Sequence, residues 1–132
     1  MFELTINEKV YQFNFGIGFR RELDPKITRK IDGVNGKVEQ LGLQMVIAGV
    51  MDGDVEDIIT VLDAANKGFE PRISRKEIEN YIENEDTDLD ALCEKLIGFF
   101  ERANCTKKTV QNLKKMLEEQ KAKKEAEQNE QK

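Results

Sequence analysis

Hydrophobic and polar residues alternate along the first fifteen positions of the chain. The apolar members of this alternation are Phe2, Leu4, Ile6, Tyr11, Phe13 and Phe15. Alternation with period 2 predicts strands that are buried on one face. The polar pair Asn7-Glu8 interrupts the pattern, so we expect a two-residue hairpin loop there. Such a loop would pair Ile6 with Lys9, Leu4 with Tyr11, and Phe2 with Phe13, and would gather the aromatic rings on one face.

A two-stranded hairpin is only marginally stable, so its apolar face needs cover from the rest of the chain. Apolar residues recur at helical spacing in most of that remainder. The segments predicted to be helical are 19–23, 38–51, 55–65, 74–82, 89–103 and 106–117. We therefore predict an α+β domain, mainly helical, in which an N-terminal hairpin packs on a bundle of five or six helices.

Segment 38–51 is apolar on nearly all sides, which predicts a central helix buried all round. Gly42 and Gly49 each cost a helix about 1 kcal/mol relative to alanine, so we expect each to mark the close approach of a neighbour. Segment 26–36 is polar and contains two glycines, which predicts a loop.

Several helix starts carry capping residues. Asp54 is placed to cap segment 55–65, Ser74 and Glu77 have the spacing of a capping box, and Thr106 can cap the last helix. Residues 118–132 are mostly Glu, Gln, Lys and Ala with no apolar face to bury, which predicts a fraying helix and a disordered, charged tail. The expected domain organisation is therefore a single globular domain over 1–117, with the hairpin in 1–15 and helices in 17–117, followed by the tail in 118–132.

Composition narrows the possible functions. The 132 residues carry a net charge of −5, contain no histidine or tryptophan, and are 36% charged. An acidic balance is unfavourable for binding nucleic acid, because phosphate recognition requires a basic surface. No apolar run approaches the ~18 residues of a membrane span, and no signal peptide pattern opens the chain. We therefore expect a soluble cytosolic protein that binds neither nucleic acid nor membrane.

Residues with catalytic or ligand chemistry are few. Cys93 and Cys105 are too few and too far apart for a disulfide scaffold or a zinc site. Asp52, Asp54 and Glu56 match the start of a calcium-binding loop, but Asp57 stands where that loop requires glycine. No nucleophile lies beside a plausible base in the sequence. We predict no catalytic residues, no metal site, no cofactor and no enzymatic activity.

The pattern resembles the tail assembly chaperones of long-tailed (siphovirus-type) phages and prophages of Gram-positive bacteria. The resemblance rests on the stretches Met1–Asn7 and Tyr11–Phe19, and it continues through the apolar segment 38–51 and the segment 89–100. It implies a protein of the host cytoplasm that binds the tape measure protein and keeps it soluble during tail morphogenesis, and that is absent from the mature virion. It also implies contacts with the tail tube protein and a frameshifted longer form of the chain itself.

The residues that we single out for client binding are Phe2, Leu4, Tyr11, Phe13, Phe15 and Phe19. The alternative for the same side chains is that they form the core of the domain itself. The hairpin edges could pair with another copy, so we also expect self-association. A second function remains open: a small DNA-associated phage or plasmid regulator that uses residues 69–84, where Arg72, Arg75 and Lys76 are basic.

Overall fold

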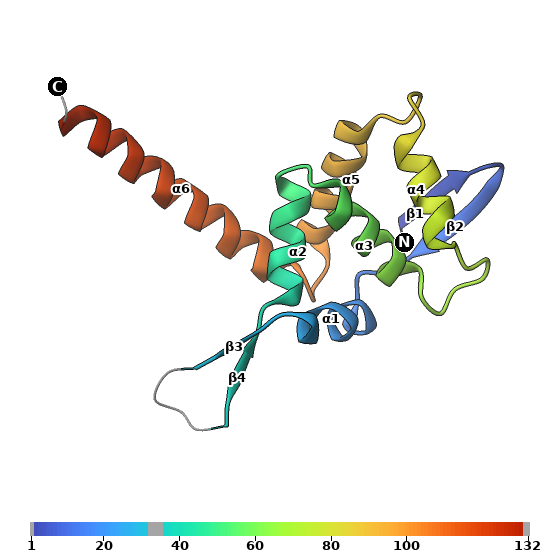
Figure 1. The fold of residues 1–132 in the computed structure, drawn as a ribbon, viewed down its shortest axis with the longest axis horizontal. Coiled ribbons are helices and arrows are strands. Elements are labelled where there is room, and N and C mark those ends of the chain that lie inside the picture. Colours follow the sequence, from blue (N-terminus) through green and yellow to red (C-terminus); the bar gives the residue numbers. More distant parts are fainter. Residues whose placement is uncertain (1, 32–35, 131–132) are drawn as a thin grey trace.

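The computed structural model describes residues 2–31 and 36–130 of the chain (Figure 1). Six helices and two hairpins are formed by these residues, which confirms the predicted α+β, mainly helical class. In chain order the elements are β1 (Phe2–Ile6), β2 (Lys9–Phe13), α1 (Ile17–Leu23), the 3-10 turn η1 (Asp24–Lys26), β3 (Thr28–Lys30), β4 (Val38–Gln40), α2 (Gly42–Met51), α3 (Val55–Asn66), α4 (Arg75–Glu83), α5 (Leu89–Arg102) and α6 (Lys107–Glu130).

The N-terminal hairpin has the predicted register. Phe2 lies opposite Phe13, Leu4 opposite Tyr11, and Ile6 opposite Lys9. Asn7 and Glu8 form the two-residue loop with φ angles of 51° and 67°. Positive φ at both central positions is the geometry whose twist matches that of paired strands, so the loop fixes this register.

The apolar face of this hairpin packs on α5 through aromatic rings. The ring centroids of Phe2 and Phe99 are 4.9 Å apart, and those of Phe15 and Phe100 are 5.1 Å apart, both pairs meeting edge to face. This geometry places the electropositive ring edge against the electronegative face, which adds about 0.5–1.5 kcal/mol per pair to the burial of area. The core therefore joins the N-terminal region of the chain to α5.

A buried polar side chain ties the hairpin to the helices. Asn66, the last residue of α3, is fully buried. Its amide nitrogen donates to the backbone oxygen of Gln12 at 2.9 Å, and its amide oxygen accepts from the backbone nitrogen of Ile73 at 2.7 Å and from Arg72 at 3.1 Å. Because burying an amide is favourable only when its hydrogen bonds are satisfied, this residue fixes the end of α3, strand β2 and the start of α4 relative to one another.

A second hairpin occupies a region that we predicted to be a loop and the start of a helix. Strand β3 pairs antiparallel with β4, so the loop prediction is wrong for 28–30 and the helix prediction is wrong for 38–40. All three side chains of β3 are exposed, and so is Val38, at 53%. The two strands bury no apolar face, so they leave no alternation in the sequence from which to predict them. Residues 32–35 of the predicted loop lie outside the described residues.

Helix α2 begins at Gly42, four residues later than predicted. It is central, but it is not buried all round, because Met45 is 51% exposed. The prediction for its glycines is confirmed. A Cβ atom on Gly42 would lie 1.7 Å from the backbone oxygen of Leu23, and one on Gly49 would lie 1.6 Å from a carboxylate oxygen of Asp57.

The predicted caps form at α3 and α4. Asp54 accepts hydrogen bonds from the backbone nitrogens of the first turn of α3, and Ser74 and Glu77 form a complete capping box on α4. The hydroxyl of Thr106 donates instead to the backbone oxygen of Phe100, at 2.7 Å, and so ties the start of α6 to the end of α5.

Helix α6 extends well past the body of the molecule (Figure 1). In its first turns, the α6 residues Val110 and Leu113 are buried against the body of the molecule. All side chains from 114 to 128 are exposed. The chain is helical through Glu130, and the disorder that we predicted within 118–132 stays a prediction.

Substitution of Gly42 by alanine tests the close approach of α2 to α1. Since the new Cβ would meet backbone on the other side, we expect Gly42→Ala to lower the free energy of unfolding by about 3 kcal/mol. Gly18→Ala is the matched control, because nothing lies within 4 Å of its added Cβ. The control should raise stability by about 0.5–1 kcal/mol. Equal effects of the two substitutions in urea unfolding would contradict this packing.

A hydrogen bond between the hairpin and α4 makes stability depend on pH. The hydroxyl of Tyr11 donates to the Glu77 carboxylate at 2.8 Å. This bond, followed by those from Ser74, lowers the pKa of Glu77 below its ordinary 4.5. A lowered folded-state pKa stabilises the protein above pH 4.5, and this stabilisation is lost as the pH falls through the folded value.

Tyr11→Phe retains the buried ring and removes only this hydrogen bond. We expect it to lower the free energy of unfolding at pH 7, because a hydrogen bond to a charged acceptor stabilises the folded chain. The difference from the unsubstituted protein should shrink as the pH falls below 4.5. Denaturant unfolding at pH 7 and at lower pH measures it, and a difference that does not change with pH would exclude the carboxylate as the partner.

Candidate functional site

The six residues predicted to contact a client are all buried in the folded chain. Phe2, Leu4, Tyr11, Phe13, Phe15 and Phe19 belong to the hydrophobic core. Direct contact of their full side chains with another protein would require the hairpin to separate from α5. Five of the six nevertheless line one or another of three separate hollows at the surface.

The most apolar of the three hollows lies where the hairpin meets the junction between α5 and α6. It has a volume of about 380 Å³, and we call it the aromatic hollow. Its walls are formed by Phe2, Phe13, Asn14, Phe15, Gly16, Phe99, Ala103, Asn104 and Cys105. Three of the predicted residues therefore line this site, although each of them is at most 4% exposed.

Two cations lie on the rings beside this hollow. The ammonium of Lys95 is 5.1 Å from the ring centroid of Phe2, and the guanidinium of Arg102 is 4.7 Å from that of Phe99. A cation over an aromatic face is attracted by the ring quadrupole, which is worth about 0.5–1 kcal/mol at an exposed site. The aromatic surface is therefore framed by positive charge from α5.

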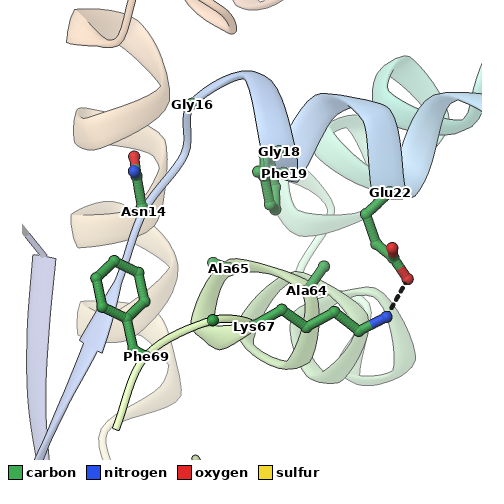
Figure 2. A pocket seen from close by; sticks show the side chains of 10 residues that line it. Asn14, Gly16, Gly18, Phe19, Glu22, Ala64, Ala65, Lys67 and Phe69 are labelled. Atoms are coloured by element: carbon green, nitrogen blue, oxygen red, sulfur yellow. Dashed lines mark hydrogen bonds and ion pairs between the residues drawn. The ribbon is translucent and has the colours of Figure 1, made fainter.

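A second hollow, of about 310 Å³, lies on the other side of the segment from Asn14 to Gly16 (Figure 2). Phe19 and Phe69 contribute its aromatic side chains, and α3 forms its floor with Ala64 and Ala65. An ion pair between Lys67 and Glu22 closes one end, as the dashed line in Figure 2 marks. The hydrogen bond from Lys67 lowers the pKa of Glu22 below its ordinary value.

The segment that separates the two hollows is held by the backbone. The nitrogen of Asn14 donates to the oxygen of Ala65 at 2.9 Å. This bond lies close to the Asn66 side chain that holds Gln12, so both hollows are positioned by the end of α3. Leu4 lines a third, separate hollow near α4, and Tyr11 lines none of the three.

Phe99, Ala103 and Cys105 were not among the residues that we predicted for client binding. Phe99 and Ala103 belong to the apolar stripe of α5, whose spacing predicts core positions, and both pack against the core. Cys105 follows the end of that helix. The stripe is wider than the hairpin that covers it, so these residues stay partly exposed. Only the position of the hairpin on α5 shows which end of the apolar stripe the hairpin leaves uncovered.

Burial, followed by the nearby Asp90 carboxylate, raises the pKa of the Cys93 thiol, which makes its nucleophilic thiolate scarce at neutral pH. In the part of the chain that the structure describes, no three His, Cys, Asp or Glu side chains gather to hold a metal ion. None of the helices described there has the length and apolar character to cross a membrane.

Apolar surface with a charged rim is a feature of surfaces that bind other proteins. Comparison with known families specifies the class of protein. A family model described as "Phage tail assembly chaperone protein, TAC" matches residues 3–115. The chain belongs to this family, as the resemblance in its sequence implied. No curated protein and no solved structure matches the chain.

The match extends from β1 into α6, and it includes the aromatic hollow apart from Phe2, the second hollow and the end of α3. It favours the chaperone over the DNA-associated regulator that we considered for residues 69–84. In that region Arg72 is engaged within the protein, since its guanidinium donates to Asp63 at 2.8 Å and to Asn66 at 3.1 Å.

Proposed function

We propose that this protein binds the tape measure protein of its phage and keeps it soluble until the tail tube assembles around it. It does so in the host cytoplasm, without enzymatic activity, and is absent from the mature virion. The tail tube protein and a frameshifted longer form of the chain are further proposed partners. The observation that carries this proposal is the match of the tail assembly chaperone family to residues 3–115.

The aromatic hollow is the proposed contact for the client. This proposal requires the tape measure protein to present apolar side chains before assembly, and a hollow lined by Phe2, Phe15 and Phe99 can take one such side chain at a time. The exterior around it is charged, and the net charge of −5 favours solubility of the complex.

The size of the hollow also indicates how such binding would work. Burial of one leucine or phenylalanine side chain gives about 1.5–3 kcal/mol, whereas a millimolar dissociation constant requires about 4.1 kcal/mol. One hollow therefore holds a client weakly. Several copies along one long client would multiply these weak contacts and could still be displaced by the tube protein.

Co-expression with the tape measure protein tests the proposal. We expect the soluble fraction of that protein to rise and a complex with several copies of the chaperone to co-purify. A tape measure protein that stays insoluble, with this chain eluting alone, would contradict it.

Two substitutions of Cys105 test the aromatic hollow within the same experiment. Cys105→Trp should fill the hollow and reduce the co-purified tape measure protein several-fold, whereas Cys105→Ser leaves it open and should retain the complex. Circular dichroism and thermal unfolding verify that both variants fold. If Cys105→Trp folds and retains the full complex, the client binds elsewhere.

A further inference from the structure

Charge is strongly segregated along this chain. Between Glu77 and Glu94 there are eight acidic residues and no basic one. Between Lys107 and Lys124 there are seven lysines and only two glutamates. The first segment includes most of α4, its connection to α5 and the start of α5, and the second is most of α6.

The acidic segment surrounds the third hollow, of about 300 Å³, which we call the acidic hollow. It is lined by Leu4, Tyr81, Asp86, Thr87, Asp88, Ala91, Leu92 and Lys95. Its base is thus largely apolar, and two carboxylates stand at its edge. The connection that forms it is braced internally, because the hydroxyl of Thr87 donates to the Tyr81 oxygen at 2.7 Å and the Asp86 nitrogen donates to the Asn84 side chain at 2.9 Å.

The second element is the projecting part of α6, residues 114–128, which we call the α6 arm. Every side chain in it is exposed, including Met116 at 47% and Leu117 at 50%. Leu117 lies in a groove along the arm whose other walls include Lys121 and Lys124. At 1.5 Å per residue, the arm extends roughly 22 Å beyond the last buried turn. The arm carries five lysines and four glutamates. The groove beside Leu117 is the more basic part of it, because it is lined by Lys114, Lys121 and Lys124 and by one glutamate, Glu118.

We propose that the α6 arm of one copy docks in the acidic hollow of a second copy. Leu117 and its neighbours would cover the apolar base formed by Tyr81 and Ala91, and the arm lysines would face the carboxylates of the acidic segment. The complementarity in charge and in apolar area selects a second copy of this chain as the occupant. This inference does not rest on binding of the tape measure protein.

The two surfaces lie on different parts of the molecule, so one copy cannot satisfy both with itself. The arm projects on one side of α2, and the connection between α4 and α5 lies beyond α5 on the other (Figure 1). A contact between two different surfaces repeats from copy to copy, and it generates a closed ring or an open helical filament. Such an assembly would present aromatic hollows at regular intervals.

Two charge-reversed variants test this contact. The hollow variant carries Glu83→Lys and Asp86→Lys, and the arm variant carries Lys121→Glu and Lys124→Glu; all four side chains are exposed. In sedimentation velocity we expect the unsubstituted chain to form larger species as its concentration rises, and less so at high salt. Each variant alone should stay monomeric. An equimolar mixture should form the larger species again, because each native surface then meets its native counterpart and the two charge-reversed surfaces attract each other.

Any of three sedimentation results would overturn the proposal. The unsubstituted chain could stay monomeric, either variant alone could still self-associate, or the mixture of the two variants could stay monomeric. The control Glu8→Lys with Glu70→Lys changes the net charge as the hollow variant does, and it should retain self-association; its loss would assign the effect to net charge. Circular dichroism verifies folding. Since the aromatic hollow is unchanged in all variants, co-purification of the tape measure protein reports on client binding separately.

Discussion

The fold depends on cover for a hairpin that cannot stand alone. Two strands of five residues have no stability of their own in water, and here every aromatic side chain of the pair lies on one face. Packing of Phe2 and Phe15 on Phe99 and Phe100 removes this face from water and at the same time covers α5. Because the N-terminal hairpin and α5 bury each other's apolar side chains, we do not expect the hairpin or the helices around α5 to fold independently.

Polar bonds then fix how the hairpin sits. Asn66 binds strand β2 and the start of α4 to the end of α3. Tyr11 binds the hairpin to Glu77 in α4. These bonds determine where the aromatic face ends, and hence where the core opens to the surface. The aromatic hollow is thus a consequence of the packing: α5 offers more apolar stripe than a short hairpin can cover.

Period-2 alternation and a loop that tolerates positive φ were sufficient to predict the register of β1 and β2, because a slip of one residue would expose the rings. The capping box at Ser74 was also predictable, as it depends only on local spacing. The second hairpin was not predictable, because strands such as β3 that bury no side chain leave no alternation of apolar and polar residues in the sequence. The aromatic hollow depends on how far β1 extends along α5, which is a matter of tertiary packing that no local pattern in the sequence records.

The central claim is that the client contacts the rim of the aromatic hollow while the aromatic core stays closed. Amide hydrogen exchange of the chain, alone and in complex with the tape measure protein, tests it most directly. We predict slower exchange in the complex at Asn104 and Cys105, with unchanged exchange in β1 and β2. Faster exchange in the two strands would contradict the account, because it would mean that the hairpin lifts from α5 and offers its buried rings to the client.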